Sequence, residues 1–271
     1  LGAAEVARLT GARGYVGGLV DRRGGSLHPL RYALGLAQAA EAAGAVLHGG
    51  TRVAEVRSDD AAAVAVTEGG ATVTARAALV CTNALTGPLA APLGRTVVPV
   101  SSVQVATAPL GPNLGAGILP EGHSPSDSRR LPLYWRRDAA GRFVIGGRGA
   151  AGGAAIRARQ AALRAAAVAM HPQLAAAEWS HAWGGTVAIT ADGLPGLHRL
   201  GPRVMAGLGF NGRGVAMATL MGRVLADWAD GAPEGALDLP VTPARPIPFH
   251  RFRRLGLGVT VAAFHLLDRL G

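Results

Sequence analysis

The sequence predicts an α/β plus α+β protein in which an antiparallel sheet is inserted into an α/β layer. Three stretches support this prediction. Residues 77–81 form a continuous apolar run, which is typical of a parallel strand at the centre of a sheet. Residues 97–108 instead alternate apolar and polar side chains, as a half-buried antiparallel strand does. Helical periodicity returns at 215–230, so the α/β pattern resumes after the alternating segment.

The segment before the apolar run contains two helices and several short strands. Pro29 suits the first position of a helix, and Gly44 suits the position just after its end. Between them, apolar residues recur at spacings of three and four, as on the buried face of a helix. The elements expected here, in chain order, are helices at 3–10 and 29–43, strands at 45–48 and 52–57, and a hairpin of 64–67 with 72–75.

The segment after the alternating strand contains further strands and helices. The elements expected are a loop at 109–130, strands at 133–137 and 142–147, a helix at 156–170, strands at 178–188 and 203–207, and the helix at 215–230. An α/β layer interrupted by antiparallel strands is typical of an inserted domain. We therefore place one domain at 1–95 and 183–250, the inserted domain at 96–182, and a helical tail at 251–271.

Composition excludes several classes of protein. Hydrophobic residues make up 49% of the 271 residues and charged residues 16%, so the chain can bury enough apolar surface to fold. The net charge is +10 and every fixed cation is an arginine, because the sequence contains no lysine. These arginines are scattered and aromatic residues are only 4%, so we expect no nucleic-acid partner.

Cysteine, histidine and hydropathy patterns exclude further classes of site. Cys81 is the single cysteine, so the chain can form no internal disulfide and no cysteine-based zinc site, and we expect an inert residue at the end of a buried strand. The eight histidines show no metal-ligand spacing. No apolar run reaches the roughly 20 residues that a bilayer span needs. We expect no metal, no membrane span and a cytoplasmic location.

A glycine-rich turn, Gly207-Leu208-Gly209-Phe210-Asn211-Gly212, stands between a predicted strand and helix. It spells G-x-G-x-x-G, but no second strand with an acidic end follows, so it is not a first dinucleotide-binding turn. Consecutive glycines nevertheless let the backbone approach a flat or anionic ligand, and the helix that follows would direct its N-terminal N–H groups at it. An ordinary tight turn is the alternative interpretation.

Several aromatic residues are candidates for a pocket wall. By strand alternation, Tyr134 and Arg136 share one face, and Trp135 lies on the other. Trp183 followed by Gly184 could bring a large ring and bare backbone near a ligand, although a tryptophan of this kind can equally lie in the core.

Seven segments spread along the chain carry a family likeness: Tyr15–Leu19, Gly25–Leu30, Tyr32–Ala37, Ala42–Ala45, Cys81–Ala84, the strand pair Asp138–Gly147, and Trp183 through Gly214. The strand pair is similar to a "DGR-x-x-x-GG" pattern in which Ala139 and Ala140 are inserted. In this order and spacing, the segments resemble the FAD-dependent amine and amino-acid oxidoreductases of the D-amino-acid-oxidase-like superfamily. The nearest branch is that of the gamma-glutamylputrescine oxidoreductases.

The resemblance implies a fold, a cofactor and a reaction. The fold is an FAD-binding, glutathione-reductase-like domain with an inserted antiparallel-sheet substrate domain. The reaction is hydride transfer from a carbon that bears an amine to the flavin, followed by hydrolysis of the imine. The partners are a small-molecule amine and oxygen or another electron acceptor. The flavin carries this chemistry, so no catalytic side chain is assigned.

The resemblance also implies site residues. Those matched to cofactor-binding positions are Val53, Thr82, Asn83, Gly184, Gly209, Asn211, Gly212, Arg213 and Gly214. Those assigned to the substrate are Tyr134, Arg136 and Trp183.

Two departures from the family pattern matter. Nothing before residue 15 could be the family's first β-α-β unit, so the FAD-binding domain is expected to be incomplete and the sequence truncated. The alternative to an active enzyme is therefore a non-catalytic remnant, or a half-protein that needs a partner segment to bind FAD. The second departure is Val187, which stands where α-amino-acid oxidases often carry an arginine. An apolar side chain cannot clamp a carboxylate, which favours an amine without a nearby α-carboxylate, unless Arg136 or Arg148 supplies the charge.

Overall fold

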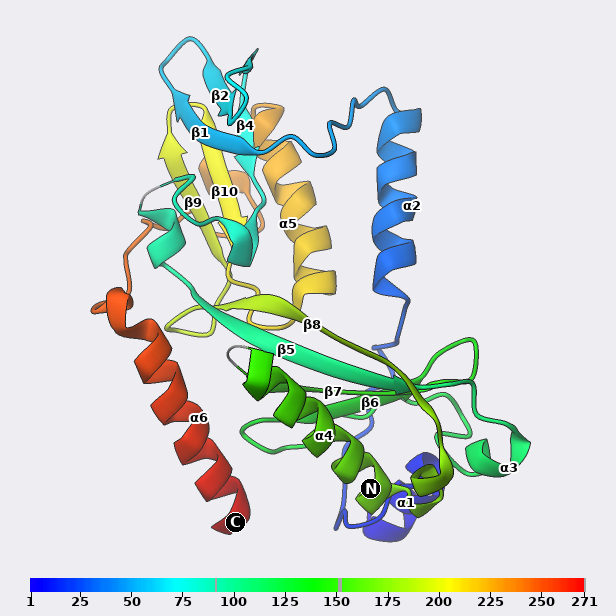
Figure 1. Ribbon diagram of the computed structural model, residues 1–271. Helices are drawn as coiled ribbons and strands as arrows, with labels where there is room; N and C mark the ends of the chain where they lie inside the picture. The colour runs from blue at the N-terminus through cyan, green and yellow to red at the C-terminus, as the bar shows by residue number, and fades with distance from the viewer. Residues whose placement is uncertain (91, 151–152, 271) are drawn as a thin grey trace. The chain divides into compact units, whose positions relative to one another are not determined.

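The computed structural model describes residues 1–90, 92–150 and 153–270 (Figure 1). The chain divides into two compact units. The first unit contains Leu1–Tyr32, Ser101–Gly185 and Leu255–Gly271, and the second unit contains Ala33–Val100 and Thr186–Arg254. These units group residues 1–32 and the C-terminal segment with the antiparallel sheet, whereas the predicted domains separate them from it. The functional role of each predicted domain stays a prediction.

The first unit is built around a four-stranded sheet. In spatial order, its strands are β6 (Leu133–Arg137), β7 (Phe143–Ala150), β5 (Val98–Thr107) and β8 (Trp179–Ile189). β7 pairs antiparallel with both β6 and β5, as the alternating pattern predicts. The helices assigned to this part of the chain are α1 (Ala3–Thr10), α3 (Pro112–Gly115), α4 (Gly153–Met170) and α6 (Arg253–Leu270). The short helix α3 falls within the segment predicted as a loop.

Strand alternation explains how this sheet forms its core. Trp135 is buried with Val103 and Ile145, and this cluster packs against Leu163 of α4. Tyr134 and its neighbour two residues on, Arg136, are only half-buried. The alternation of burial along β6 confirms that these two side chains share the face opposite Trp135.

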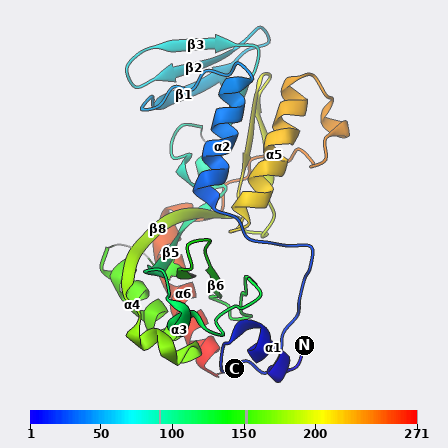
Figure 2. The same cartoon turned by 90° about the vertical axis from the view of Figure 1, so that its right-hand side faces the viewer.

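The second unit contains two three-stranded sheets. The first, an antiparallel meander (Figure 2), consists of β1 (Val53–Ser58), β2 (Ala63–Thr67) and β3 (Thr72–Ala75). The second consists of β4 (Ala78–Val80), β10 (Val204–Leu208) and β9 (Gly196–Gly201), with β4 parallel and β9 antiparallel to β10. The helices are α2 (Pro29–Ala42), which begins in the first unit, and α5 (Gly214–Ala229).

Helix α5 packs on β10 because Gly207 has no side chain. A Cβ atom at Gly207 would overlap the side chain of Met221, which lies on α5. Met221, Val224 and Leu225 of α5 form a core with Met205 of β10. The strand, the glycine turn and the helix therefore form one packed β–α unit.

Two predictions about the elements are wrong, and one described strand was not predicted. No described strand pairs with residues 45–48, which form no strand, and Val46 and Leu47 are exposed there. The apolar run forms the short strand β4, which is parallel as predicted but lies at the edge of the described sheet rather than at its centre. Strand β9 was not predicted, because residues 196–201 follow a turn sequence and include a histidine and an arginine.

Candidate functional site

The elbow, defined here as Gly207–Gly214, connects β10 to α5 as the sequence predicts. Gly209, Asn211 and Gly212 have positive φ values of 78°, 52° and 84°. Glycine adopts this conformation readily, and asparagine tolerates it better than most residues. The chain reverses within these few residues and presents the first turn of α5 at the end of β10.

Asn211 fixes the shape of the elbow from within. Its Nδ2 donates to the carbonyl oxygen of Gly209 at 2.6 Å and to Oγ1 of Thr190 at 3.0 Å, while its Oδ1 accepts from the backbone N–H of Thr190 at 2.9 Å. A side-chain amide thus replaces the backbone hydrogen bonds that a tight turn lacks. The half-buried Asn211 therefore has a structural role in holding the turn, whatever else it contacts.

The elbow has a packed half and an open half. A Cβ atom at Gly209 would overlap Cγ2 of Thr190, and both Gly209 and Phe210 are buried. At Gly214, by contrast, no described heavy atom outside its own helix turn and chain neighbours lies within 4 Å of such a Cβ atom. Gly212 and Arg213 are exposed. Backbone that a ligand could approach is therefore confined to 212–214, at the start of α5.

Asn83 joins a second predicted cofactor segment to the elbow. Its Oδ1 accepts a hydrogen bond of 3.0 Å from the backbone N–H of Gly209. Asn83 follows β4 and has a positive φ of 46°. Because β4 and β10 run parallel, their carboxyl ends meet at one edge of the sheet, the usual place for ligands in such layers. The structure thus brings Asn83, Gly209 and Asn211 together at one sheet edge.

The remaining cofactor candidates of the second unit are placed differently. Thr82 is exposed, and its hydroxyl lies 2.8 Å from that of Thr86. Arg213 donates to the carbonyl oxygen of Gly193 at 2.7 Å. Val53 begins β1 in the separate antiparallel sheet, where it pairs with Thr67. Cys81 precedes Thr82 and is exposed, so the expectation that it ends a buried strand is wrong.

The predicted substrate residues lie in the first unit, where Tyr134 contacts Ser102. The hydroxyl groups of Tyr134 and Ser102 are 2.6 Å apart. A Cβ atom at Gly184 would lie 3.3 Å from the carbonyl oxygen of Ser102, so β8 passes close to this point. Arg136 lies on the same strand face as Tyr134, and Trp183 is 42% exposed. Ser102 was not among the predicted site residues; the alternation of β5, in which the neighbouring Val103 is buried, was the signal that places it on the polar face.

Two adjacent glycines allow large side chains to lie on both faces of β7. A Cβ atom at Gly146 would overlap the ring of Tyr134, and one at Gly147 would overlap Nη2 of Arg159. Arg159 belongs to α4, and its burial lowers the pKa of its guanidinium. Within the described residues, its Nε and Nη2 have no hydrogen-bond partner. This explains physically why the strand pair ends in two glycines, and Arg159 was missed because nothing in the sequence links it to Gly147.

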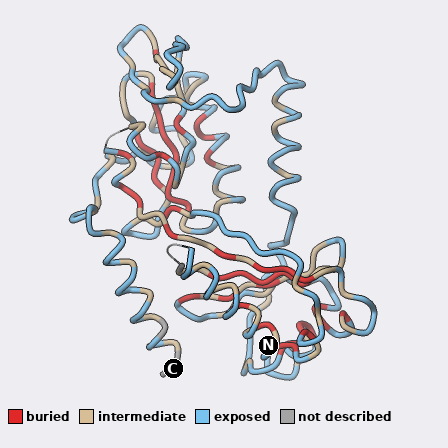
Figure 3. Tube along the Cα trace, in the orientation of Figure 1, coloured by how far each residue is buried: buried red, intermediate tan, exposed pale blue. Residues whose placement is uncertain are grey.

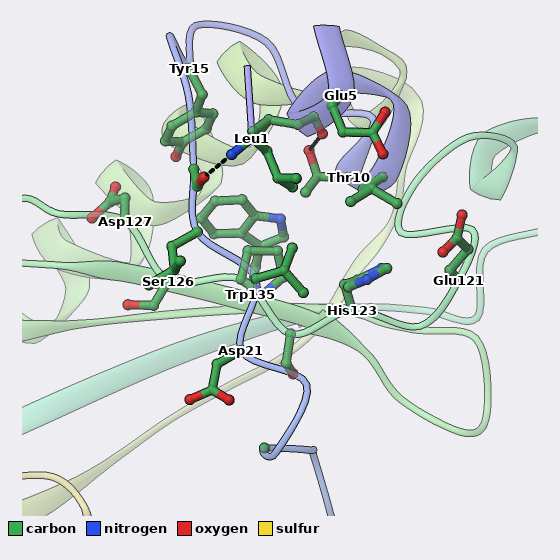
Figure 4. A pocket seen from close by; sticks show the side chains of 18 of the residues that line it. Leu1, Glu5, Thr10, Tyr15, Asp21, Glu121, His123, Ser126, Asp127 and Trp135 are labelled. Atoms are coloured by element: carbon green, nitrogen blue, oxygen red, sulfur yellow. Dashed lines mark hydrogen bonds between the residues drawn. The ribbon is translucent and has the colours of Figure 1, made fainter. Parts of the chain in front are cut away.

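The first unit also contains a cavity of about 1030 Å³ (Figure 4). Tyr15 and Trp135 stack in its wall with ring centroids 5.6 Å apart. Burial, together with the nearby carboxylate of Asp127, raises the pKa of Tyr15 to about 12. The described lining includes none of the residues predicted for cofactor or substrate.

Metal-ligand clusters and membrane-spanning helices are both absent from the described residues. Among the residues that the structure describes, no three histidine, cysteine, aspartate or glutamate side chains gather as metal ligands. None of the helices in the described ranges has the length and hydropathy that a membrane span requires.

Comparison with known proteins gives the family. Residues 1–228 match the DAO family, described as FAD dependent oxidoreductase. A probable oxidoreductase OrdL of Rhizobium meliloti (strain 1021) is 34% identical over 268 residues, which are 97% of this chain and 61% of that protein. A gamma-glutamylputrescine oxidoreductase of Escherichia coli (strain K12) is 28% identical over 273 residues, 100% of this chain and 64% of that protein. The chain thus spans less than two thirds of either relative.

Solved structures give the same answer for the fold. Glycine oxidase from Geobacillus kaustophilus has a TM-score of 0.62 and 26% identity, covering 78% of this chain and 56% of that one. Iminodiacetate oxidase from Chelativorans sp. BNC1 has a TM-score of 0.63 and 20% identity, and the match covers 79% of this chain and 57% of that one. The predicted fold class, branch resemblance and cofactor of the family, FAD, are confirmed. The order of elements and the match over 228 residues support one conclusion: the chain belongs to the DAO family of FAD-dependent oxidoreductases.

Proposed function

We propose that the chain contributes to an FAD-dependent oxidoreductase that oxidises the C–N bond of a small-molecule amine. The observation that carries this proposal is the hydrogen bond from Gly209 to Asn83, which joins two predicted cofactor segments beside the open backbone at 212–214. The chemistry that FAD would supply is acceptance of a hydride from the carbon that bears the amine, after which the imine hydrolyses. Oxygen or another acceptor would take up the electrons.

The elbow fits such a cofactor through its backbone. The N-terminal N–H groups of an α-helix carry a partial positive charge, which favours an anionic edge of a ligand. At α5, the N-cap residue Arg213 makes no side-chain capping hydrogen bond within the described chain, so these N–H groups are not covered by a cap. In this proposal Gly212 and Gly214 allow close approach, while Asn83 and Asn211 hold the elbow in place.

The polar face of the four-stranded sheet fits the substrate. Tyr134 is held by Ser102, so its hydroxyl has a fixed position from which to orient a polar group. Arg136 on the same face would pair with an anionic group of the substrate that lies away from the amine-bearing carbon. Val187, by contrast, offers nothing to an α-carboxylate, which supports an amine that lacks one. The assignments of Val53, Thr82, Gly184 and Trp183 remain part of the proposal, as does a cytoplasmic location.

A flavin-binding titration tests the proposal. The chain is mixed with FAD, alone and with a supplied β-α-β segment that carries a G-x-G-x-x-G turn. Bound flavin absorbance that bleaches anaerobically on addition of an amine is expected. Gly214→Leu should weaken FAD binding by at least about tenfold, because its side chain would occupy the open space at the start of α5. Gly222→Leu, also in open space on α5, is the matched control and should bind normally.

The same experiment decides the alternative, a half-protein that binds FAD only with a partner segment. Two observations favour this alternative. None of the described residues of α2 is buried (Figure 3), and its Leu30 and Leu34 are exposed. Leu79 on the edge strand β4 is 38% exposed as well. Binding that appears only with the supplied segment would establish the half-protein. Absence of bound flavin under both conditions would contradict the oxidoreductase and leave a non-catalytic remnant.

A further inference from the structure

Helix α6 has two apolar stripes, of which one faces its own protein and the other faces outward. The inner stripe includes Leu257, Val261 and Phe264, which are half-buried at spacings of four and three. The outer stripe consists of Leu255, Val259 and Leu266, which are 70%, 64% and 59% exposed. Along α6, exposed and half-buried residues alternate with the period of the helix (Figure 3).

The inner stripe is fixed to the first unit. Asp268 accepts hydrogen bonds from the backbone N–H groups of Arg130 at 3.1 Å and Leu131 at 3.3 Å. Val261 lies beside Gly149, where a Cβ atom would be 3.4 Å from its side chain. Because α6 is held by this side, the outer stripe is turned away from the sheet it docks on. A helix face that contacts only water would carry polar residues there.

The charges around the outer stripe have one sign. Arg254 immediately precedes Leu255 and is exposed, and Arg251 is exposed just before α6. Asp268 is the single acidic residue after Asp238 in the sequence, and its oxygens already accept from Arg130 and Leu131. The described part of α6 thus offers a cationic beginning and an apolar outer face, on a chain whose net charge is +10.

We propose that the outer stripe of α6 lies on an anionic lipid surface. Such a surface supplies phosphate groups to Arg251 and Arg254 and apolar chains to Leu255, Val259 and Leu266. A second copy of the chain fits less well, because parallel helices would bring their arginines together. Antiparallel helices would oppose those arginines to an Asp268 that is already bonded. The proposal concerns binding to the surface and not passage through the membrane.

A vesicle flotation assay with the full chain tests this proposal. Vesicles of phosphatidylcholine mixed with phosphatidylglycerol should carry the protein, and vesicles of phosphatidylcholine alone should not. Val259→Glu should abolish flotation, since it places a charge in the middle of the stripe. Arg254→Gln should weaken binding about fivefold, the effect of one arginine at an anionic surface. Val73→Glu, at a residue 57% exposed on β3, is the matched control and should float like the unchanged chain.

Each other result overturns the proposal. Equal flotation with both kinds of vesicle would show that the arginines do not bind lipid phosphates. Unchanged flotation of Val259→Glu would show that the outer stripe does not contact the lipid. A dimer that forms without vesicles and dissociates in Val259→Glu would assign the stripe to a second copy instead. Circular dichroism and thermal unfolding must match between Val259→Glu and Val73→Glu, so that a loss of flotation is not due to unfolding. The assay needs no flavin, so its result is independent of the proposed oxidoreductase activity.

Discussion

The elbow of the second unit and the paired glycines of β7 in the first unit need glycine for different physical reasons. In the elbow, Gly209 has a positive φ that side chains rarely adopt, and it also packs against Thr190. In β7, Gly146 has ordinary strand backbone, and its missing side chain makes room for Tyr134. The first requirement is local to the chain, whereas the second comes from contact with a distant residue. Substitutions should therefore be rescuable in β7 and not in the elbow.

The largest effect is expected at the elbow. Gly209→Ala must accept both a positive φ and an overlap with Thr190, which together should lower the free energy of unfolding by about 3 to 5 kcal/mol. Urea denaturation measures this change. Gly222→Ala, inside α5 with open space around it, is the matched control and should raise the free energy of unfolding by about 0.5 to 1 kcal/mol. A full rescue of Gly209→Ala by Thr190→Ser would show that overlap alone matters, against the proposed contribution of φ.

The two units should also differ in their response to acid, through His171. This residue is fully buried beside Phe143 in the first unit, and burial lowers its pKa from 6.5 to about 4. The unfolded chain therefore binds the proton first as the pH falls. Stability that is complete above pH 6.5 should be lost between about pH 6.5 and 4, by roughly 3 kcal/mol in total. Denaturation across this range should show a shallower decline for His171→Leu than for the unchanged chain.

An exposed histidine provides the control for this measurement. His48→Asn changes an exposed residue of the second unit and serves as the comparison variant. If His171→Leu loses stability between pH 6.5 and 4 as steeply as His48→Asn does, the acid sensitivity does not come from His171.

The sequence predicts what is local and misses what depends on distant contacts. The G-x-G-x-x-G spacing placed the elbow between β10 and α5, and alternation separated Tyr134 from Trp135, because both follow from backbone geometry. Arg159 and Ser102 were missed as neighbours of β7 and Tyr134, because those contacts join residues far apart in the chain. The apolar content of β4 suggested a central strand. Whether a strand lies at the edge or at the centre of a sheet depends, however, on which strands lie beside it.

Gly146→Ala should have the next largest effect, and it tests the claim of rescue. The new methyl group would displace the ring of Tyr134 and break its hydrogen bond to Ser102, at a cost of about 2 kcal/mol. Adding Tyr134→Ala should recover part of this loss, because the overlapping atoms are then gone. Double-mutant denaturation measures the coupling. If the losses in the free energy of unfolding simply add in the double variant, the overlap between the new methyl group and the ring of Tyr134 is not the cause of the Gly146→Ala effect.

Asn83→Ala should have a smaller effect on stability, and it connects the elbow to the proposed cofactor. The change removes the acceptor for the backbone N–H of Gly209, which should lower the free energy of unfolding by about 1 to 2 kcal/mol. In the FAD titration it should also weaken binding, because the elbow loses its fixed position. Leu85→Ala, at a side chain that is 81% exposed in the same segment, is the control for stability. Normal FAD affinity in Asn83→Ala would show that this hydrogen bond does not contribute to cofactor binding.

Tyr134→Phe should have the smallest effect on stability and isolates one hydrogen bond. The ring still covers Gly146, so only the bond to Ser102 is lost, at a cost of about 1 kcal/mol. If Tyr134 orients the amine, steady-state kinetics of the flavin-loaded protein should change much more than the free energy of unfolding does. Ser102→Ala breaks the same bond from the other side and leaves the tyrosine hydroxyl in place. Equal kinetic losses in the two variants would mean that the hydroxyl acts only through its position, whereas a larger loss in Tyr134→Phe would indicate direct contact with the substrate.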